Sequence, residues 1–243
     1  MNPGDIVYVK AGTYSETVTL SKTGSADNRF TIEVYNNDEV TVTGGFTFTG
    51  DYYTVKGFKI TSGAIRFNSG ASYNIADNCF LDRVSGTAVL FSSGSSHNTA
   101  RYCNIYRPGN KGCEITGSYN TFEYCVIEGP TGQNGGDSDG LRTNNGDHNT
   151  IRGNHIFRIF QVGSSHADCM QHWLGFRNLT VEDNILGSWE TSPTRDPANA
   201  HFMLEIFDDS YDVDGLIIRR NIFLGGGPRS LNVNESHPSK KFY

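Results

Sequence analysis

Acidic and imidazole side chains gather in Gly-, Ser- and Asn-rich stretches in the second half of the chain. The stretch at 129–140 carries Asp137 and Asp139. The stretch at 161–173 carries four side chains that could do chemistry, His166, Asp168, Gln171 and His172. Two carboxylates held close together repel each other, so one can hold a proton while the other is ionised. Such a pair can act as general acid and base, provided the fold brings Asp139 and Asp168 together.

A third stretch, at 187–209, carries further polar and aromatic candidates, among them Trp189, Arg195 and Glu205. Carboxylate oxygens also suit calcium, and a His pair beside an Asp can equally be a metal site or an acid–base pair. An Asp at a strand entry is often only a turn residue whose side chain accepts hydrogen bonds from nearby backbone N–H groups. For Asp137 that structural role remains open beside the metal role.

A repeated sequence pattern must position these side chains. Six segments have a polar turn, an apolar β-type stretch, then an Asn or Cys followed by an apolar pair, as in YNTFEYCVI at 119–127. By subtraction, the fixed position recurs at spacings of 25, 22, 29, 30 and 37 residues, at Asn78, Cys103, Cys125, Asn154, Asn184 and Asn221. A period in this range indicates a solenoid, in which each repeat buries its apolar face by stacking on the next.

The composition of the repeat favours strands over helices. Its runs are short, rich in Ile, Val, Thr, Phe and Tyr, and bounded by Gly, Asn, Ser and Asp. Asn in a repeated column suits a corner, because Asn tolerates left-handed backbone angles and can hydrogen-bond its counterpart in the next coil. We therefore expect an all-β protein, a parallel β-helix forming one domain over residues 1–243. Counting an earlier coil at 54–60, seven or more coils would make a rod on the order of 35 Å tall.

Alignment of the coils brings the two carboxylates together. Asp139 lies 15 residues before Asn154, and Asp168 lies 16 residues before Asn184. The two Asp residues should therefore occupy matching positions on adjacent coils, roughly 5 Å apart.

The same alignment predicts which neighbours point outward. If Leu141 and Met170 face the core, strand alternation turns Arg142 and Gln171 to the outside, beside one another. The best match in the next coil places Glu205 in the same outward column. The candidate site thus spans three coils, with His166 and His172 at its edge.

Composition excludes several classes of protein. A net charge of -6 argues against a nucleic-acid partner, which normally meets a basic face. No apolar run is long enough to span a membrane, and residues 1–20 lack the basic start and apolar centre of a signal peptide. The five Cys are odd in number and include no CxxC, so they predict no disulfide framework. Cys103 and Cys125 are expected to be buried thiols at the repeat corners.

The opening of the chain carries a family resemblance. Residues 1–45 contain a PGD turn, an apolar strand, a GTY turn and a strand ending in Gly, and they resemble the start of right-handed parallel β-helix proteins of the pectate-lyase-like superfamily. In such proteins a capping helix usually precedes the PGD turn, whereas this chain starts two residues before it. We therefore expect the usual N-terminal cap to be lacking, with self-association possible through a first coil that exposes Ile6, Val7 and Val9.

The resemblance implies a protein outside the cell or on a virion that acts on a polysaccharide, while the net charge and the short apolar runs predict no nucleic-acid or membrane partner. An acidic, uronate-containing glycan is preferred, cleaved by lyase-type β-elimination or by hydrolysis. The expected catalytic residues are Asp139, Asp168, Arg142, His166 and Glu205. Substrate binding is assigned to Gln171, His172, Trp173, Trp189 and Arg195. Calcium is a candidate cofactor, held by Asp137, Asp139 and Asp168.

Two alternatives stay open. Lyases of this superfamily often use Lys or Arg as the base, and no Lys occurs between Lys111 and Lys240, so a lyase must rely on Arg142, another Arg or a His. The same fold also occurs in tailspikes and adhesins, so a non-catalytic glycan-binding or structural module remains the alternative to an enzyme.

Overall fold

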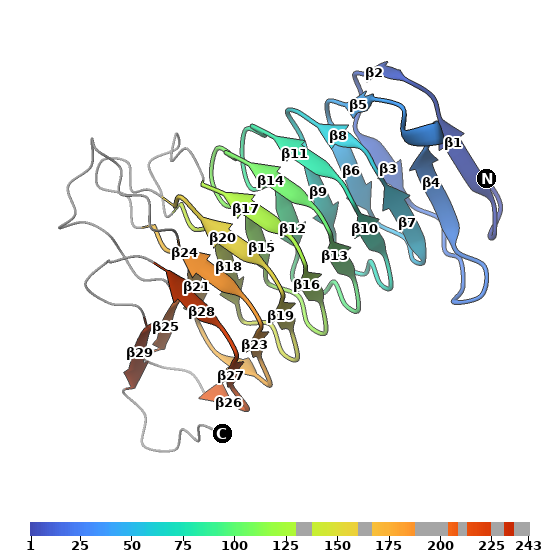
Figure 1. The fold of residues 1–243 in the computed structure, drawn as a ribbon. Helices are drawn as coiled ribbons and strands as arrows, with labels where there is room; N and C mark the ends of the chain where they lie inside the picture. Colours follow the sequence, from blue (N-terminus) through green and yellow to red (C-terminus); the bar gives the residue numbers. More distant parts are fainter. Residues whose placement is uncertain (130–137, 160–166, 188–203, 209–212, 225–230, 236–243) are drawn as a thin grey trace.

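The computed structural model describes residues 1–129, 138–159, 167–187, 204–208, 213–224 and 231–235. The chain winds into an elongated stack of coils (Figure 1). Among the described residues each coil contributes one strand to each of three parallel sheets, and each sheet has nine strands. This confirms the predicted all-β parallel β-helix, and the number of coils agrees with the expected seven or more.

The sheet here called sheet A contains, in spatial order, β1 (Ile6–Val9), β4 (Phe30–Val34), β7 (Tyr53–Lys56), β10 (Ile75–Asp77), β13 (Thr99–Arg101), β16 (Thr121–Glu123), β19 (Thr150–Arg152), β23 (Thr180–Glu182) and β27 (Ile217–Arg219). Sheet B contains β2 (Gly12–Tyr14), β5 (Val40–Val42), β8 (Lys59–Ile60), β11 (Phe80–Asp82), β14 (Asn104–Tyr106), β17 (Val126–Glu128), β20 (His155–Phe157), β24 (Ile185–Gly187) and β28 (Ile222–Leu224).

Sheet C carries the candidate site. It contains β3 (Val18–Leu20), β6 (Gly45–Phe48), β9 (Ala64–Phe67), β12 (Val89–Phe91), β15 (Cys113–Ile115), β18 (Leu141–Asn144), β21 (Met170–Trp173), β25 (Leu204–Asp208) and β29 (Leu231–Glu235). A small extra pair joins β22 (Phe176–Arg177) to β26 (Val213–Asp214), and one 3₁₀ turn, η1, covers Tyr35–Asn37. No helix among the described residues is long and apolar enough to cross a membrane.

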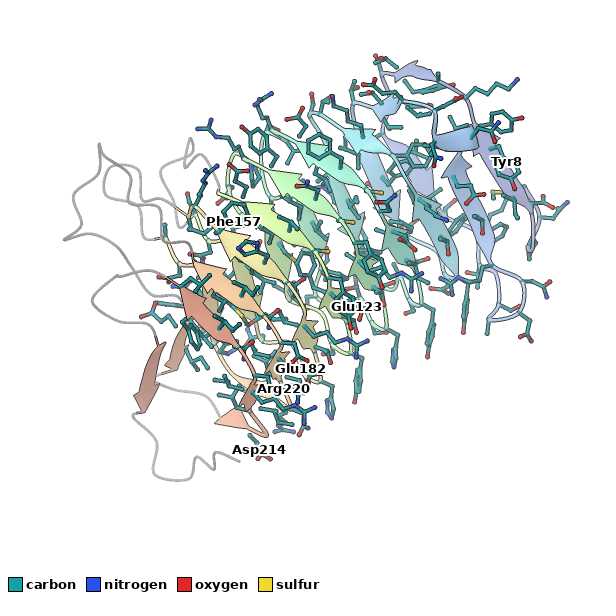
Figure 2. All side chains as sticks on the ribbon, viewed as in Figure 1. Tyr8, Glu123, Phe157, Glu182, Asp214 and Arg220 are labelled. Atoms are coloured by element: carbon teal, nitrogen blue, oxygen red, sulfur yellow. The ribbon has the colours of Figure 1, made fainter. Side chains whose placement is uncertain are left out.

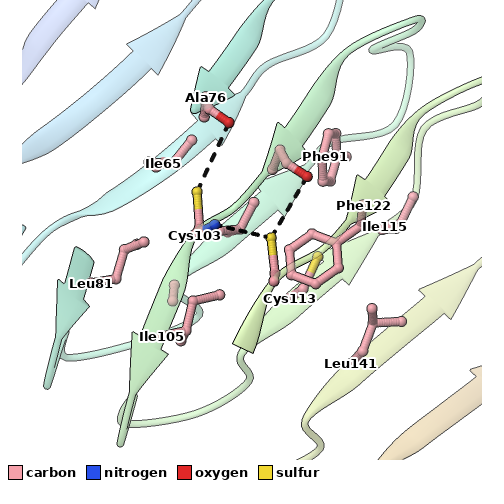
Figure 3. Close-up of a cluster of buried hydrophobic side chains, with 14 of the residues drawn as sticks. Ile65, Ala76, Leu81, Phe91, Cys103, Ile105, Cys113, Ile115, Phe122 and Leu141 are labelled. Atoms are coloured by element: carbon pink, nitrogen blue, oxygen red, sulfur yellow. Dashed lines mark hydrogen bonds between the residues drawn. The ribbon is translucent and has the colours of Figure 1, made fainter. Parts of the chain in front are cut away.

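The core is a set of apolar columns that run up the inside of the rod. On sheet C the rings of Phe48, Phe67 and Phe91 stack in successive coils, with centroids 4.7 and 4.6 Å apart. Figure 3 shows the next part of this core, where Cys113 and Phe122 pack among aliphatic side chains. All five Cys are free and buried, and burial raises the pKa of the Cys113 thiol. The thiols therefore act as small apolar groups, as expected for Cys103 and Cys125.

The repeated Asn and Cys form a buried ladder at the corner between sheets A and B. The Asn154 side chain accepts from the backbone N–H of Cys125 at 2.9 Å, and its own amide donates to the side chain of Asn184 at 3.0 Å. Asn184 donates in turn to Asn221. Each coil thus satisfies the backbone groups of its neighbour's corner, which fixes the vertical register of the stack.

The first member of this column was predicted one residue too early. Because β10 pairs with β13 with Ile75 opposite Thr99, the residue in line with Cys103 is Cys79, which is buried. Asn78 is exposed and adopts a left-handed φ of 50°. Asn78 and Cys79 are adjacent, and both Asn and Cys occur in this column, so the sequence pattern alone selected the wrong one of the two.

A second buried Asn ladder, not recognised from the sequence, occupies the corner between sheets C and A. Asn74 donates to Asn98 at 3.0 Å and Asn98 to Asn120 at 3.2 Å, while the backbone N–H of Asn120 donates to Asn149 at 2.9 Å. A column of stacked rings, with centroids 4.5 to 4.9 Å apart, runs beside this ladder. Its residues all have a left-handed φ and are Tyr52, followed by the four that directly precede the ladder Asn residues, Tyr73, His97, Tyr119 and His148. The two His residues of this column, His97 and His148, occupy the same structural position as the tyrosines.

Sheet A carries a column of alternating charges on its outer face. Strand pairing places Glu123 beside Arg152, whose side chains approach to 2.6 Å, and Glu182 beside Arg219, also at 2.6 Å. The full column, read up the stack, is Glu33, Lys56, Asp77, Arg101, Glu123, Arg152, Glu182 and Arg219. Figure 2 shows Glu123 and Glu182 on this side of the rod. Opposite charges on neighbouring coils neutralise one another over this face.

The first coil has an open outer edge among the described residues. Ile6 and Tyr8 of β1 are 53% and 55% exposed, and no α-helix of the described part of the chain covers them. β1 is an edge strand of sheet A, so one row of its backbone N–H and C=O groups has no neighbouring strand among the described residues.

Candidate active site

The outer face of sheet C brings the predicted site residues together. The pairing of β18 with β21 places Arg142 beside Gln171, and the pairing of β21 with β25 places Gln171 beside Glu205. This is the register that the sequence predicts for the three side chains. They form one outward column across three successive coils, because residues paired between parallel strands share a face.

The two aspartates lie just before strands β18 and β21, at matching positions on adjacent coils. The backbone N–H of Asp168 donates to Oδ1 of Asp139 at 3.1 Å, and the backbone N–H of Gly140 donates to the Asp168 carbonyl at 2.8 Å. Both Asp side chains are buried. Asp139 therefore holds the entrance of the next strand in place as well as lying beside Asp168.

Gln171 connects the aspartates to the third carboxylate. Its Nε2 donates to Oδ2 of Asp168 at 3.3 Å and to Oε2 of Glu205 at 3.2 Å. One amide has two N–H groups, so it can satisfy one oxygen of each carboxylate at once. Asp139, Asp168, Gln171 and Glu205 thus form a buried acidic cluster, the name used below for these four residues.

Arg142 lies at the border of the acidic cluster. Its guanidinium sits over the Trp173 ring with 5.6 Å between the guanidinium carbon and the ring centroid. Trp173 is 37% exposed. A planar cation on an indole face can present its N–H groups to a carboxylate in two parallel hydrogen bonds, which suits recognition of an anionic ligand.

Lys111 is a basic residue of this site that sequence reasoning set aside. The backbone N–H of Gly112 donates to the Asp139 carbonyl, so Lys111 occupies, one coil earlier, the position held by Asp139 and Asp168. Lys111 is buried and its Nζ lies 3.7 Å from Oε1 of Glu114. The sequence repeat could have revealed this position. Aligning Cys113 with Leu141 puts Lys111 in line with Asp139.

His172 lies on the inside of the coil. It is paired with Thr143 and Ile206 in a core-facing column, is fully buried, and its Nδ1 is 2.7 Å from Oγ1 of Thr143. Strand alternation explains this placement, since the residue after the outward Gln171 must point inward. His172 was expected at the edge of the site, but it lies in the core, behind Gln171.

Four expected site residues, Asp137, His166, Trp189 and Arg195, lie outside the described residues. Asp137 bears on the calcium prediction, because calcium takes six to eight oxygen ligands. Asp139 and Asp168 supply carboxylates of the right kind. No group of three or more His, Cys, Asp or Glu side chains within the described ranges is arranged to hold a metal. Those residues alone therefore do not make a calcium cage.

Cys169, which follows Asp168, is not a nucleophile. Burial, with the added negative charge of Asp168, raises the pKa of its thiol well above the ordinary value. The thiolate is the reactive form of cysteine, so this side chain is inert at neutral pH. Among the residues that the structure describes, the site therefore offers carboxylates, one amide and the cations Arg142 and Lys111.

Comparison with solved structures defines the class of fold. The chain is similar to the crystal structure of pectate lyase Pel9A, with 17% identity over 91% of this chain and 72% of that one and a TM-score of 0.59. It is also similar to the alginate lyase from Paenibacillus sp. str. FPU-7, with 17% identity over 96% and 93% of the two chains and a TM-score of 0.55.

These similarities show a parallel β-helix, which is the fold that the opening residues suggested. At this level of identity they show the fold alone. No protein-family model matches the chain, and a comparison with curated proteins gives no match.

Proposed function

We propose that this protein binds and cleaves an acidic, uronate-containing polysaccharide at the outer face of sheet C. The observation that carries the proposal is the acidic cluster, in which carboxylates from neighbouring coils converge on Gln171, next to the guanidinium of Arg142. Burying carboxylates costs desolvation free energy, so the retention of three buried carboxylates in the acidic cluster supports a functional role. Similar solved structures are a pectate lyase and an alginate lyase, which supports a glycan as the ligand.

Cleavage by β-elimination makes definite demands on these groups. A cation must neutralise the uronate carboxylate, so that a base can take the proton from C5. The electron pair then forms the C4–C5 double bond, the bond from C4 to the glycosidic oxygen breaks, and that oxygen receives a proton. We assign neutralisation of the carboxylate to Arg142, which lies in the column, and removal of the C5 proton to Lys111, the other described basic group beside the column.

Hydrolysis is the second candidate, favoured by the number of carboxylates. In that reaction one carboxylic acid protonates the glycosidic oxygen and an ionised carboxylate activates water. Asp168 and Glu205 share the Gln171 amide, so they are the pair we assign to acid and base. A non-catalytic glycan-binding module, as in a tailspike or adhesin, remains the alternative outside the enzymes. Because polymeric glycans of this kind lie outside the cytoplasm, we propose an extracellular or virion-associated location.

A glycan panel tests the proposal. The purified chain is incubated with polygalacturonate, polymannuronate, polyguluronate and neutral polysaccharides, with and without added calcium. Ultraviolet absorbance detects the unsaturated product of elimination, and a reducing-end assay detects both reactions. A rise in both signals identifies a lyase, and a rise in reducing ends alone identifies a hydrolase. Binding without product identifies a non-catalytic module. The proposal is overturned if the chain shows no binding to any uronate polymer and forms no product from any of them.

A further inference from the structure

The outward column that contains Arg142 continues toward the N-terminal coils. Strand pairing places Arg142 beside Glu114, Glu114 beside Leu90, and Leu90 beside Arg66. Arg66 is exposed on β9, in the same coil as β7 and β8. It lies three strand spacings from Arg142, which corresponds to about 14 Å along the rod.

Arg66 differs from the arginines of sheet A. There, each outward Arg has a carboxylate partner on the preceding coil, with contacts of 2.8 Å from Arg101 to Asp77 and 2.6 Å from Arg152 to Glu123. Arg66 forms no ion pair among the residues that the structure describes. Its nearest partners in the column are Thr47 and Leu90, which carry no charge. An exposed guanidinium without a carboxylate is therefore available to an anionic ligand.

Charge is distributed unevenly along this face. On this face the described cations Arg66, Lys111 and Arg142 lie in the coil of Asp139 or in coils nearer the N-terminus. On the same side Glu114 is the carboxylate of the column, and Lys111 lies 3.7 Å from it. From Asp168 onward the described ionisable groups of the site are carboxylates. An anionic polymer is thus attracted to one side of the cluster and repelled on the other.

We infer that Arg66 is a specificity-determining residue, which binds a carboxylate of the acidic glycan whose anionic stretch lies over β9, β12, β15 and β18. The inference rests on the proposed function for the existence of a glycan site. It adds the direction in which the glycan runs and the number of coils that it covers. Leu90 is half-buried and lies between Arg66 and Glu114 in the column, where it offers an apolar contact to a sugar ring of the bound glycan. Only an oligosaccharide long enough to reach from Arg142 to Arg66 engages both guanidinium groups.

The test compares two variants that each remove one positive charge from the same coil. Arg66→Gln removes it from sheet C, and Lys56→Gln removes it from sheet A, where Lys56 is also exposed. Dissociation constants are measured by calorimetry for size-graded oligogalacturonates and oligomannuronates, and for the same oligomers with their carboxyl groups reduced to alcohols. Circular dichroism and a thermal midpoint check that both variants fold.

We expect Arg66→Gln to weaken binding of long oligouronates about tenfold, the usual effect of losing one hydrogen bond between charged groups. Lys56→Gln should stay within about twofold of the unmutated chain. Short oligouronates and carboxyl-reduced oligomers should not distinguish Arg66→Gln from the unmutated protein. Equal effects of the two variants, no effect of Arg66→Gln, or no binding of any oligouronate would each overturn the inference.

The outcome separates this inference from the proposed function. If the glycan panel yields no product while Arg66→Gln still weakens oligouronate binding, cleavage is wrong and the binding role of Arg66 stands. If product forms while Arg66→Gln changes neither the dissociation constant nor KM, cleavage stands and the role of Arg66 is wrong.

Discussion

The backbone N–H of Asp168 donates to the side-chain oxygen Oδ1 of Asp139 over 3.1 Å, which ties the entrances of two neighbouring strands together. The contact uses one oxygen of Asp139 and the backbone of Asp168. The Asp168 carboxylate is left to contact Gln171 within the acidic cluster. The two aspartates therefore have different roles. Asp139 holds the start of the next strand in place, and the Asp168 carboxylate contacts Gln171, which also contacts Glu205.

The first prediction concerns Asp168→Asn. The substitution keeps the size of the side chain and an oxygen that can accept from Gln171, but it removes the charge. Turnover on whichever uronate polymer is cleaved should fall at least about a hundredfold, the usual contribution of a general acid or base. Glycan affinity and the thermal midpoint should change little. Initial rates, calorimetric binding and circular dichroism measure the three quantities.

Asp77→Asn is the matched control, since it removes a carboxylate from sheet A, where Asp77 pairs with Arg101. Its turnover should equal that of the unmutated chain. Full activity in Asp168→Asn would remove Asp168 from the catalytic residues.

The second prediction concerns the corner ladder. Asn154→Ala removes the acceptor of the Cys125 N–H and the donor to the Phe122 carbonyl, both in the interior. Buried groups left without partners cost about 1–3 kcal/mol each, so we expect a loss of about 3 kcal/mol in the free energy of unfolding. Urea denaturation measures this loss. Asn104→Ala, at an exposed position on sheet B, should cost under about 0.5 kcal/mol. Equal losses would show that the ladder contributes no stability.

The third prediction concerns pH. The Arg220 guanidinium, which hydrogen-bonds the Asp183 side chain, holds the pKa of that carboxyl below its ordinary value. A carboxyl whose pKa is depressed by folding contributes stability above its unfolded pKa, and the contribution is lost as the pH falls through the folded pKa. Both side chains are exposed, so the stability effect should be small and reduced by salt.

Carboxyl-detected NMR can follow the titration of Asp183 directly. In Arg220→Gln its pKa should rise toward the ordinary value, while the remaining arginines keep it slightly depressed. An unchanged titration in that variant would contradict the assignment of the shift to Arg220.

The fourth prediction concerns the first coil. Because Ile6 and Tyr8 are more than half exposed, residues 6–10 should exchange their amide hydrogens faster than the central coils in a dilute sample. Hydrogen exchange followed by mass spectrometry resolves this region. Slowing of that exchange as the protein concentration rises would indicate self-association through this end. Strong protection in a dilute monomer would show that the first coil is well covered.

Local sequence determined the fold class and much of the site. The spacing of Asn154, Asn184 and Asn221 predicted the coil period, because a stacked corner repeats its hydrogen-bonding residue once per coil. Alternation then placed Arg142 and Gln171 outward and beside each other, since the side-chain period of a strand is two. Both signals are read within one coil and its neighbour, which a sequence can supply.

Only the tertiary structure decided the relations that depend on register. Strand pairing showed that the first member of the corner column is Cys79 and not Asn78. Pattern alone could not choose between them, because both residue types occur in the column. It brought Lys111 into line with Asp139, and it turned His172 into the core behind Gln171. Partners such as Glu123 and Arg152 are 29 residues apart in the chain, so their contact arises only when whole coils stack. A one-residue change in that stacking would turn each outward side chain inward, which is why the packed solenoid, and not the repeat, fixes the site.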